Sequence, residues 1–257
     1  SSDLGFTFDF TKQWHMKLIL QHEDKEGLEA TGAVMGISGF NPLSIVAPKP
    51  IDQETNNVDV QVAFNGEKGQ VQIDYHLSLF DNHINAFSWQ NPYELRLPSS
   101  SGYLDHIGGL SVAPDNQAHK ISLSAAYRLA AKTRFHGSFA YGLMLQDTPY
   151  IAYTVNPSLS VDSPLPRQDA DAQAETLHAN LVFTTLPVKN VDIRSSYTYD
   201  QRSNDSPMDD YAVLRNDSEH QITLLNSQTI RRNLTYGREQ HRFKIDTGYR
   251  FLAKHKL

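Results

Sequence analysis

The chain has 257 residues, of which 39% are hydrophobic and 20% charged, and its net charge is −6 at neutral pH. These fractions are those of a folded chain, and the mild acidity argues against nucleic acid as a partner, for which a basic stripe is expected. Cysteine is absent, which excludes disulfides, Cys-ligated zinc and thioether attachment of c-type haem to this chain.

Membrane-spanning helices are excluded, because no apolar run approaches the ~18–20 residues that such a helix needs. Membrane-spanning strands are not excluded, since a strand crosses a bilayer with ~9–11 residues of which only alternate ones face lipid. Alternation of apolar and polar residues is the dominant pattern; Val71 and Ile73, for example, alternate with Gln72 and Asp74. It predicts nine strands, around residues 6–10, 14–20, 58–64, 70–80, 120–129, 134–145, 177–184, 191–199 and 242–251.

The connections between these strands alternate in length. Short turns, with the Gly, Pro, Asn and Lys content of tight reversals, are predicted at residues 11–13, 65–69, 130–133 and 187–190. Long loops, well beyond the ~12–15 residues usual in a compact domain, are predicted at residues 23–57, 81–119, 147–174 and 201–240. Bacterial outer-membrane barrels have short periplasmic turns and long extracellular loops. The predicted fold is therefore all-β, an antiparallel up-and-down transmembrane β-barrel in the bacterial outer membrane.

Aromatic residues stand close to the short turns, on the apolar side of the strands. A membrane barrel carries aromatic girdles where its strands cross the bilayer surfaces, although a soluble β-sandwich also buries aromatic residues. The pattern favours a girdle at the periplasmic end. The residues of this predicted girdle are Phe10, Trp14, Tyr127, Phe135, Phe183, Tyr249 and Phe251.

Several short motifs resemble a known family of outer-membrane barrels. Residues 113–119 read Ala-Pro-Asp-Asn-Gln-Ala-His and precede the strand ISLSAAYRL, the turn AAKT and the strand RFHGSFAYGLMLQD. Tyr153-Thr154 and Asn233-Leu-Thr-Tyr236, the latter leading to RFKIDTGYRF, are further matches. With the order of strands and loops, these motifs resemble the MtrB/PioB family, whose barrels are associated with multihaem cytochromes. Family members are longer, so residues 1–257 are expected to be a single transmembrane segment of about nine strands within a larger barrel.

The resemblance implies an extracellular electron-transfer conduit and no enzymatic activity of the barrel itself. It implies that a periplasmic decahaem c-type cytochrome lies inside the barrel, so that electrons cross the outer membrane through its haems. It also implies an extracellular multihaem cytochrome at the loop side. Because the chain has no cysteine, haem c is expected on the partner and not covalently on this chain.

The polar side of the predicted strands supplies the residues expected to line the lumen and to contact such a partner. Both signs of charge occur there, which suits electrostatic pairing with an enclosed protein and also the hydration of a channel. The fourteen lumen-facing candidates are Asp9, Lys17, Asp59, Asp74, His76, Arg128, Arg134, His136, His178, Asp192, Arg194, Arg242, Lys244 and Arg250.

Two other functions fit parts of the pattern: an open porin or transporter for small solutes, and a soluble all-β binding module. Metal or haem ligation by histidine is disfavoured, because no H-x-H or H-x-x-x-H pair occurs. The acidic segments 169–171 and 205–210 lack the ligand spacing of an EF-hand calcium loop. An enzyme is disfavoured as well, because Ser99–Gly102 and Gly108–Gly109 match neither G-x-S-x-G nor a phosphate-binding loop.

Overall fold

The computed structural model describes residues 1–38, 41–90, 92, 107–155, 161, 163–214 and 228–251, with the side chains of all of these except residues 34–38, 41–43 and 228. In this part of the chain the regular secondary structure consists of β-strands alone. None of the described segments is a helix with the length and apolar character needed to cross a membrane. The predicted all-β class is confirmed.

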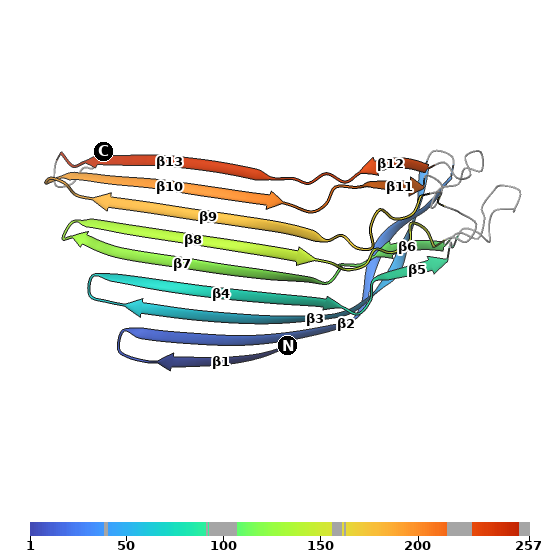
Figure 1. The fold of residues 1–257 in the computed structure, drawn as a ribbon, viewed down its shortest axis with the longest axis horizontal. Coiled ribbons are helices and arrows are strands. Elements are labelled where there is room, and N and C mark those ends of the chain that lie inside the picture. Colours follow the sequence, from blue (N-terminus) through green and yellow to red (C-terminus); the bar gives the residue numbers. More distant parts are fainter. Residues whose placement is uncertain are drawn as a thin grey trace, which may run out of the picture.

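Nine strands form a single sheet in which each strand lies beside the next one of that sheet along the chain (Figure 1). The order is β1-β2-β3-β4-β7-β8-β9-β10-β13, and all pairings are antiparallel. This up-and-down arrangement confirms the nine predicted strands. Their bounds are β1 (Ser2–Asp9), β2 (Trp14–Ser38), β3 (Asn41–Asn65), β4 (Gly69–Asn82), β7 (Asn116–Ala130), β8 (Thr133–Gln146), β9 (Ala172–Thr185), β10 (Val191–Asn204) and β13 (Arg238–Tyr249).

The four short connections lie where the sequence predicts them, at one end of the sheet that we call the tight-turn end (Figure 1). In the turn between β3 and β4, the Gly66 N–H donates to the Gly69 carbonyl at 2.8 Å. A Cβ at Gly69 would lie 2.9 Å from the carbonyl oxygen of Ala126, so glycine is required for this close approach. In the turn between β9 and β10, Asn190 has a φ of 73°, a left-handed conformation that asparagine tolerates.

The opposite end of the sheet, the loop end, is more ordered than the sequence predicts. The prediction of an irregular loop at residues 23–57 is wrong, because β2 and β3 stay paired along their full length and extend beyond the main sheet. β4 pairs with β3 only over Gln53–Asn65, so the outer half of β3 is an edge. Proline is confined to such edges because it lacks an N–H, and Pro48 and Pro50 lie in this half. The outer parts of β2 and β3 lack the alternation of apolar and polar residues, so the sequence does not predict that their backbones pair.

Two small hairpins also lie inside connections predicted as loops. One lies between β4 and β7 and the other between β10 and β13, both at the loop end (Figure 1). Their strands are β5 (Ala86–Gln90) with β6 (Ile107–Ser111), and β11 (Asp210–Leu214) with β12 (Gln228–Arg232). Each of these strands holds at most three large apolar residues, and β5 holds only Phe87 and Trp89, so alternation does not mark them as it marks the strands of the main sheet. The connection between β8 and β9 holds only an isolated bridge, Pro149 to Asp169, among its described residues.

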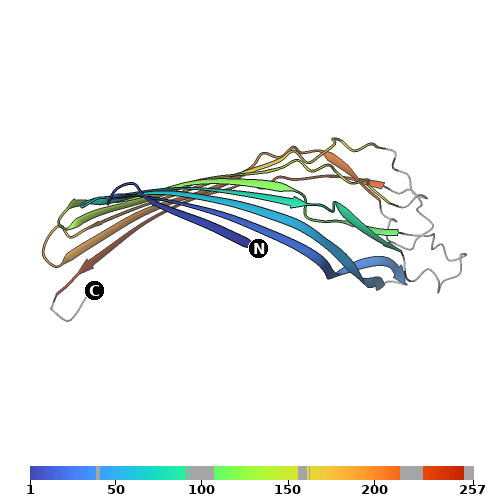
Figure 2. The same ribbon diagram turned by 90° about the horizontal axis from the view of Figure 1, so that it is seen from below.

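The main sheet is a single layer, and in the described part of the chain no second layer covers its central strands (Figure 2). The buried apolar side chains among these residues are those of Ala47 and Ala212 alone. Large apolar side chains are instead exposed on one side, 42% for Leu123 and 43% for Phe139. Contiguous apolar surface of this kind needs an apolar neighbour, and lipid supplies one. We call this side the apolar face; it includes Phe6, Leu18, Val60, Ile73, Leu123, Phe139, Leu181 and Phe243.

Aromatic rings border the apolar face at the tight-turn end, as predicted. The ring centroids of Trp14 and Phe64 lie 5.0 Å apart, and those of Tyr249 and Phe251 lie 4.8 Å apart. Such rings suit the bilayer surface, where apolar chains give way to polar head groups.

Two tyrosine–histidine pairs lie on the apolar face, near the middle of strands β4 and β10. The hydroxyl of Tyr75 lies 2.8 Å from Nδ1 of His119, and the hydroxyl of Tyr197 lies 2.8 Å from Nδ1 of His241. Each tyrosine therefore combines an apolar ring with a hydroxyl that has a hydrogen-bond partner. The sequence does not reveal these pairs, because the histidine partners come from neighbouring strands.

The sheet is bowed, twisted and open (Figure 2). β1 and β13 form its two edges, and neither pairs with a further strand of the described chain. An unpaired strand edge exposes N–H and C=O groups that lipid cannot satisfy, so a membrane sheet must close on itself. These nine strands are therefore an arc of a wall that needs additional strands.

The assignment of the two faces is testable with adjacent residues of β7. An Arg at position 123 on the apolar face should reduce the free energy of folding into a bilayer by ~2–4 kcal/mol, because a charge near the midplane loses its hydration. Ser122 lies on the other face, and S122R is the matched control. We expect L123R, but not S122R, to lower the folded fraction in a urea titration of the full-length barrel in liposomes. Equal losses would contradict the assignment.

Candidate functional site

The face opposite the apolar face, here called the polar face, carries the residues that the sequence predicts to line the lumen. The register aligns them in rows across the sheet; Lys17, Asp74 and His178, for example, are level through successive residue pairs. Followed in this way, all fourteen candidates lie on the polar face, with Arg250 continuing the alternation of β13. Their contact with a partner stays a prediction.

Three histidines of the polar face each contact a carboxylate on the adjacent strand. The Nδ1–Oδ1 pairs are His15–Asp9 at 2.6 Å, His76–Asp59 at 2.7 Å and His178–Asp200 at 2.6 Å. In all three, the two residues are direct partners in the register. His15 and Asp200 are absent from the predicted set, because alternation assigns a residue to a face without showing which residue lies opposite. These contacts fix the histidines as part of the wall.

Asp74 is the centre of another polar cluster. Its carboxylate accepts hydrogen bonds from Gln61 Nε2 at 2.9 Å and from Gln72 Nε2 at 2.8 Å. The hydroxyl of Ser122, on the next strand, lies 3.4 Å away. The middle of the polar face therefore consists of hydrogen-bonded groups that suit water or the polar surface of a protein.

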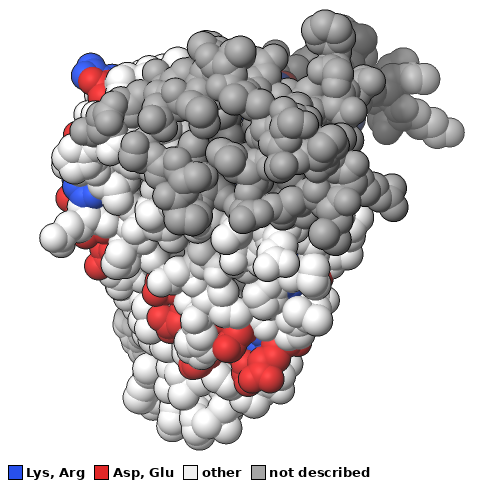
Figure 3. All heavy atoms as spheres, turned by 90° about the vertical axis from the view of Figure 1, so that its right-hand side faces the viewer, with Lys and Arg blue, Asp and Glu red and all other residues white. Residues whose placement is uncertain are grey.

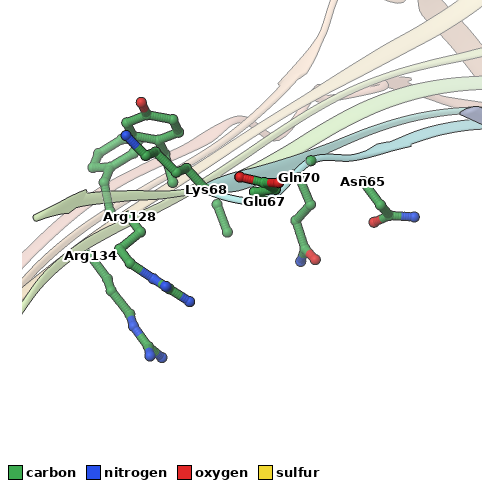
Figure 4. Close-up of a pocket in the computed structure, with 11 residues that line it drawn as sticks. Asn65, Glu67, Lys68, Gln70, Arg128 and Arg134 are labelled. Carbon is green, nitrogen blue, oxygen red and sulfur yellow. The ribbon is translucent and has the colours of Figure 1, made fainter. Parts of the chain in front are cut away.

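Arginine side chains gather at the tight-turn end of the polar face. Arg128 and Arg134 are direct partners on β7 and β8, and Arg194 lies level with them on β10. Arg128 and Arg134 border a shallow pocket of about 350 Å³, and Figure 4 shows their side chains on the same side of the sheet. Arg194 and Arg250 border a second pocket of about 460 Å³, which Asp192 also lines. This end of the polar face is basic.

The loop end has the opposite charge. Figure 3 shows this end, where Asp and Glu side chains gather on the visible surface and few Lys or Arg side chains appear. Where β2 and β3 pass the end of β4, they contribute Glu23, Asp24, Glu26, Asp52 and Glu54. Near this point Nδ1 of His83 lies 2.9 Å from Oδ1 of Asp52, and the hydrogen bond to Asp52 raises the pKa of His83.

The motif at residues 113–119 fastens the loop end to the sheet. Asn82, at the end of β4 and only 6% exposed, donates its side-chain N–H to the carbonyl of Ala113 at 2.7 Å. The backbone N–H of Asn82 donates to Oδ1 of Asp115 at 2.7 Å, and the hydroxyl of Thr148 donates to the carbonyl of Asp115 at 3.3 Å. The end of β4, the connection between β4 and β7 and the connection between β8 and β9 meet here, so the motif that carries the family resemblance has a structural role.

A second fastening joins the connection after β8 to the β11–β12 hairpin. The hydroxyls of Tyr150 and Tyr211 lie 2.8 Å apart, and burial raises the pKa of Tyr150. Nε of Arg167 donates to Asp209 at 2.6 Å, which raises the pKa of Arg167. Asn233, in the second family-like motif, accepts a hydrogen bond from the Asp209 backbone at 2.7 Å.

The residues considered for metal binding or catalysis have other roles where the structure describes them. No group of three His, Asp or Glu side chains among the described residues is arranged to hold a metal ion. In the acidic segment 205–210, Asp209 and Asp210 pair with Arg167 and Arg232 at 2.6 Å and 2.9 Å. Gly108–Gly109 lie in β6, and Ser99–Gly102 lie outside the described residues.

A single-layer, open, up-and-down sheet with an apolar face, an aromatic girdle at the tight-turn end of that face and a charged opposite face defines the wall of a transmembrane β-barrel. The family model for outer membrane beta-barrel porins, MtrB/PioB, matches residues 1–257, so the chain belongs to this family. It is therefore an outer-membrane β-barrel porin, and both the predicted family and the predicted location are confirmed.

Comparison with a curated relative agrees with the family and shows that the chain is shorter than this relative. It is 21% identical over 255 residues to the outer membrane protein MtrB of Shewanella baltica (strain OS185), which covers 99% of this chain and 33% of that protein. The chain thus spans about a third of the length of the curated relative that it matches. A solved structure, OmpT of Vibrio cholerae, aligns with 96% of this chain and 63% of its own, at 9% identity and a TM-score of 0.35.

The fastening at Asn82 gives a test of loop order. Asn82→Ala removes the buried amide that donates to the carbonyl of Ala113, which costs ~0.5–1.5 kcal/mol of local stability. We expect faster amide hydrogen exchange in residues 83–90 and 107–115. Asn116→Ala is the matched control, because its exposed side chain makes a single bond, to the carbonyl of Pro114. Equal exchange in both variants would show that the Asn82 contacts do not hold the loop.

The contact between His83 and Asp52 predicts a pH dependence. Because the pKa of His83 is raised above ~6.5, the ion pair is complete below that pH and is lost as the pH rises through the raised value. In an NMR titration of ring-labelled histidine, Asp52→Asn should lower the pKa of His83 toward ~6.5. Asp59→Asn, which removes the partner of His76 instead, should leave the His83 titration unchanged. A pKa of His83 that is unchanged by Asp52→Asn would contradict the contact between His83 and Asp52.

Proposed function

We propose that the barrel containing this chain encloses a periplasmic decahaem c-type cytochrome and positions it so that electrons cross the outer membrane. The observation that carries the proposal is the polar face, which presents charged and hydrogen-bonded side chains along the strands behind an apolar face suited to lipid. Membership of the MtrB/PioB family supports it. An extracellular multihaem cytochrome at the loop end is part of the same proposal.

The separate roles of the barrel and the cytochrome follow from the cost of placing polar groups in lipid. A polar protein surface placed in hydrocarbon loses several kcal/mol for each unsatisfied polar group. A closed barrel pairs its own backbone groups and offers lipid an apolar exterior, while its polar interior can solvate a guest. The contribution of this chain is therefore insulation from lipid and positioning of the guest, and we propose no enzymatic role for it.

The residues of this chain suit a partner that carries its own haem. Covalent attachment of haem c needs cysteine, and the chain has none. His15, His76 and His178 on the polar face are each hydrogen-bonded to a carboxylate, as wall residues are. The haem supplies the electron-transfer chemistry when the partner is bound, and the wall residues named here supply a polar surface around it.

An open porin for small solutes is the second candidate. The mixed charges of the polar face also suit a hydrated channel, and the matching family is described as porins. The two candidates differ in what fills the lumen.

Purification of the full-length barrel from its native host in detergent decides between them. If the barrel encloses the cytochrome, we expect a haem Soret band at a fixed ratio to the barrel through size-exclusion chromatography. We also expect low ion conductance of that complex in a planar bilayer. A haem-free preparation with stable open-channel conductance would contradict enclosure of a cytochrome and favour an open porin.

A further inference from the structure

We propose that Arg128, Arg134 and Arg194, here called the arginine row, form a docking surface for carboxylates of the enclosed partner at the tight-turn end. The inference rests on the proposed function, because it names the contact by which the partner would be held. The carboxylates can belong to acidic side chains or to haem propionates, which share the same chemistry. Arginine binds both through paired N–H donors.

The row is level across four strands. Arg128 and Arg134 face each other directly, and Arg134 is connected to Arg194 through Thr184. At ~4.8 Å between neighbouring strands, the three side chains are spread over ~14 Å, the width of a small acidic patch. All three arginines are exposed, so their guanidinium groups are accessible to a ligand.

The wall itself gains no stability from this arrangement. Like charges directly opposite each other on neighbouring strands are destabilising. Among the described residues, none of the three arginines has a carboxylate within 4.0 Å. Asp246, the register partner of Arg194, is instead paired with Lys244 at 3.0 Å. An anion from outside the described chain would remove the repulsion.

The position and orientation of the arginine row indicate that this anion belongs to a protein in the lumen. Tyr127 and Phe135, the sequence neighbours of Arg128 and Arg134, lie on the apolar face, so the two arginines point away from lipid. Short turns of bacterial barrels face the periplasm, and a periplasmic protein enters the lumen from that end. The row is thus at the mouth that the guest would pass.

Another pair on the polar face shows what distinguishes the row. Arg202 and Arg238 also face each other, at the loop end. Arg238 is hydrogen-bonded there to Gln240, and no third arginine lies level with the pair among the described residues. The surroundings of the arginine row also differ from those of the Arg202–Arg238 pair. The second pocket brings Lys132 and Arg250 beside Arg134 and Arg194, and Asp192 is its acidic residue.

The first experiment compares two triple variants of the full-length barrel, expressed in the native host and purified at increasing salt concentration. R128Q/R134Q/R194Q removes the row, and K120Q/R202Q/R238Q removes three exposed cations of the same face that are not among the predicted partner contacts. We expect the salt-resistant haem-to-barrel ratio to fall about tenfold for the first triple, as for three exposed ion pairs, and to stay near wild type for the second. Equal ratios in both triples would overturn the proposal. Haem-free wild-type barrel would instead reject the proposed function.

A second experiment covers the case in which the row triple fails to assemble. R128K/R134K/R194K keeps the charge and introduces amines that a carbodiimide joins to carboxylates within contact distance. Cross-linked peptides ending on Asp or Glu of the cytochrome would identify side chains as the ligand, and haem-modified peptides would identify propionates. Cross-links from Lys17 and Lys120 without any from the three new lysines would contradict the docking surface.

Discussion

Backbone hydrogen bonding within a single layer is the constraint on which the rest of this structure depends. Lipid cannot accept or donate hydrogen bonds, so each central strand must be paired on both sides. The main sheet meets this demand without an enclosed core, since Ala47 and Ala212 are the buried apolar side chains of the described chain. Stability in water from its own packing is therefore small, and the bilayer and the missing strands become part of the fold.

The same constraint divides the side chains into two populations with different tasks. Alternate residues face lipid and must be apolar within the bilayer, whereas the residues between them are free to carry charge. The polar face uses this freedom unevenly. Its middle holds paired groups such as His76 with Asp59, while its tight-turn end holds Arg128 opposite Arg134 without a described carboxylate. Charges left unbalanced by the wall are where an enclosed partner gains most from contact.

The loop end shows a second level of order. Asn82, Asp115 and Thr148 tie the β4–β7 connection to the β8–β9 connection, and Arg167 with Asp209 ties the latter to the β10–β13 connection. β2 and β3 continue beyond the membrane as one hairpin that carries acidic side chains. A rim held in this way would give the proposed extracellular cytochrome a defined surface. The family-like motifs at 113–119 and 233–236 belong to these fastenings, which explains how short loop motifs indicated a barrel family.

Alternation and turn chemistry in the sequence determined the nine strands, their faces and the four tight turns, because each rests on contacts between near neighbours in the chain. What only the tertiary structure decided depends on register, which no local pattern encodes. Register placed Asp200 opposite His178, brought the Tyr75 hydroxyl beside His119 and aligned Arg194 with Arg134 across Thr184. It also continued β2 and β3 through a predicted loop, since pairing needs backbone groups and not alternating side chains.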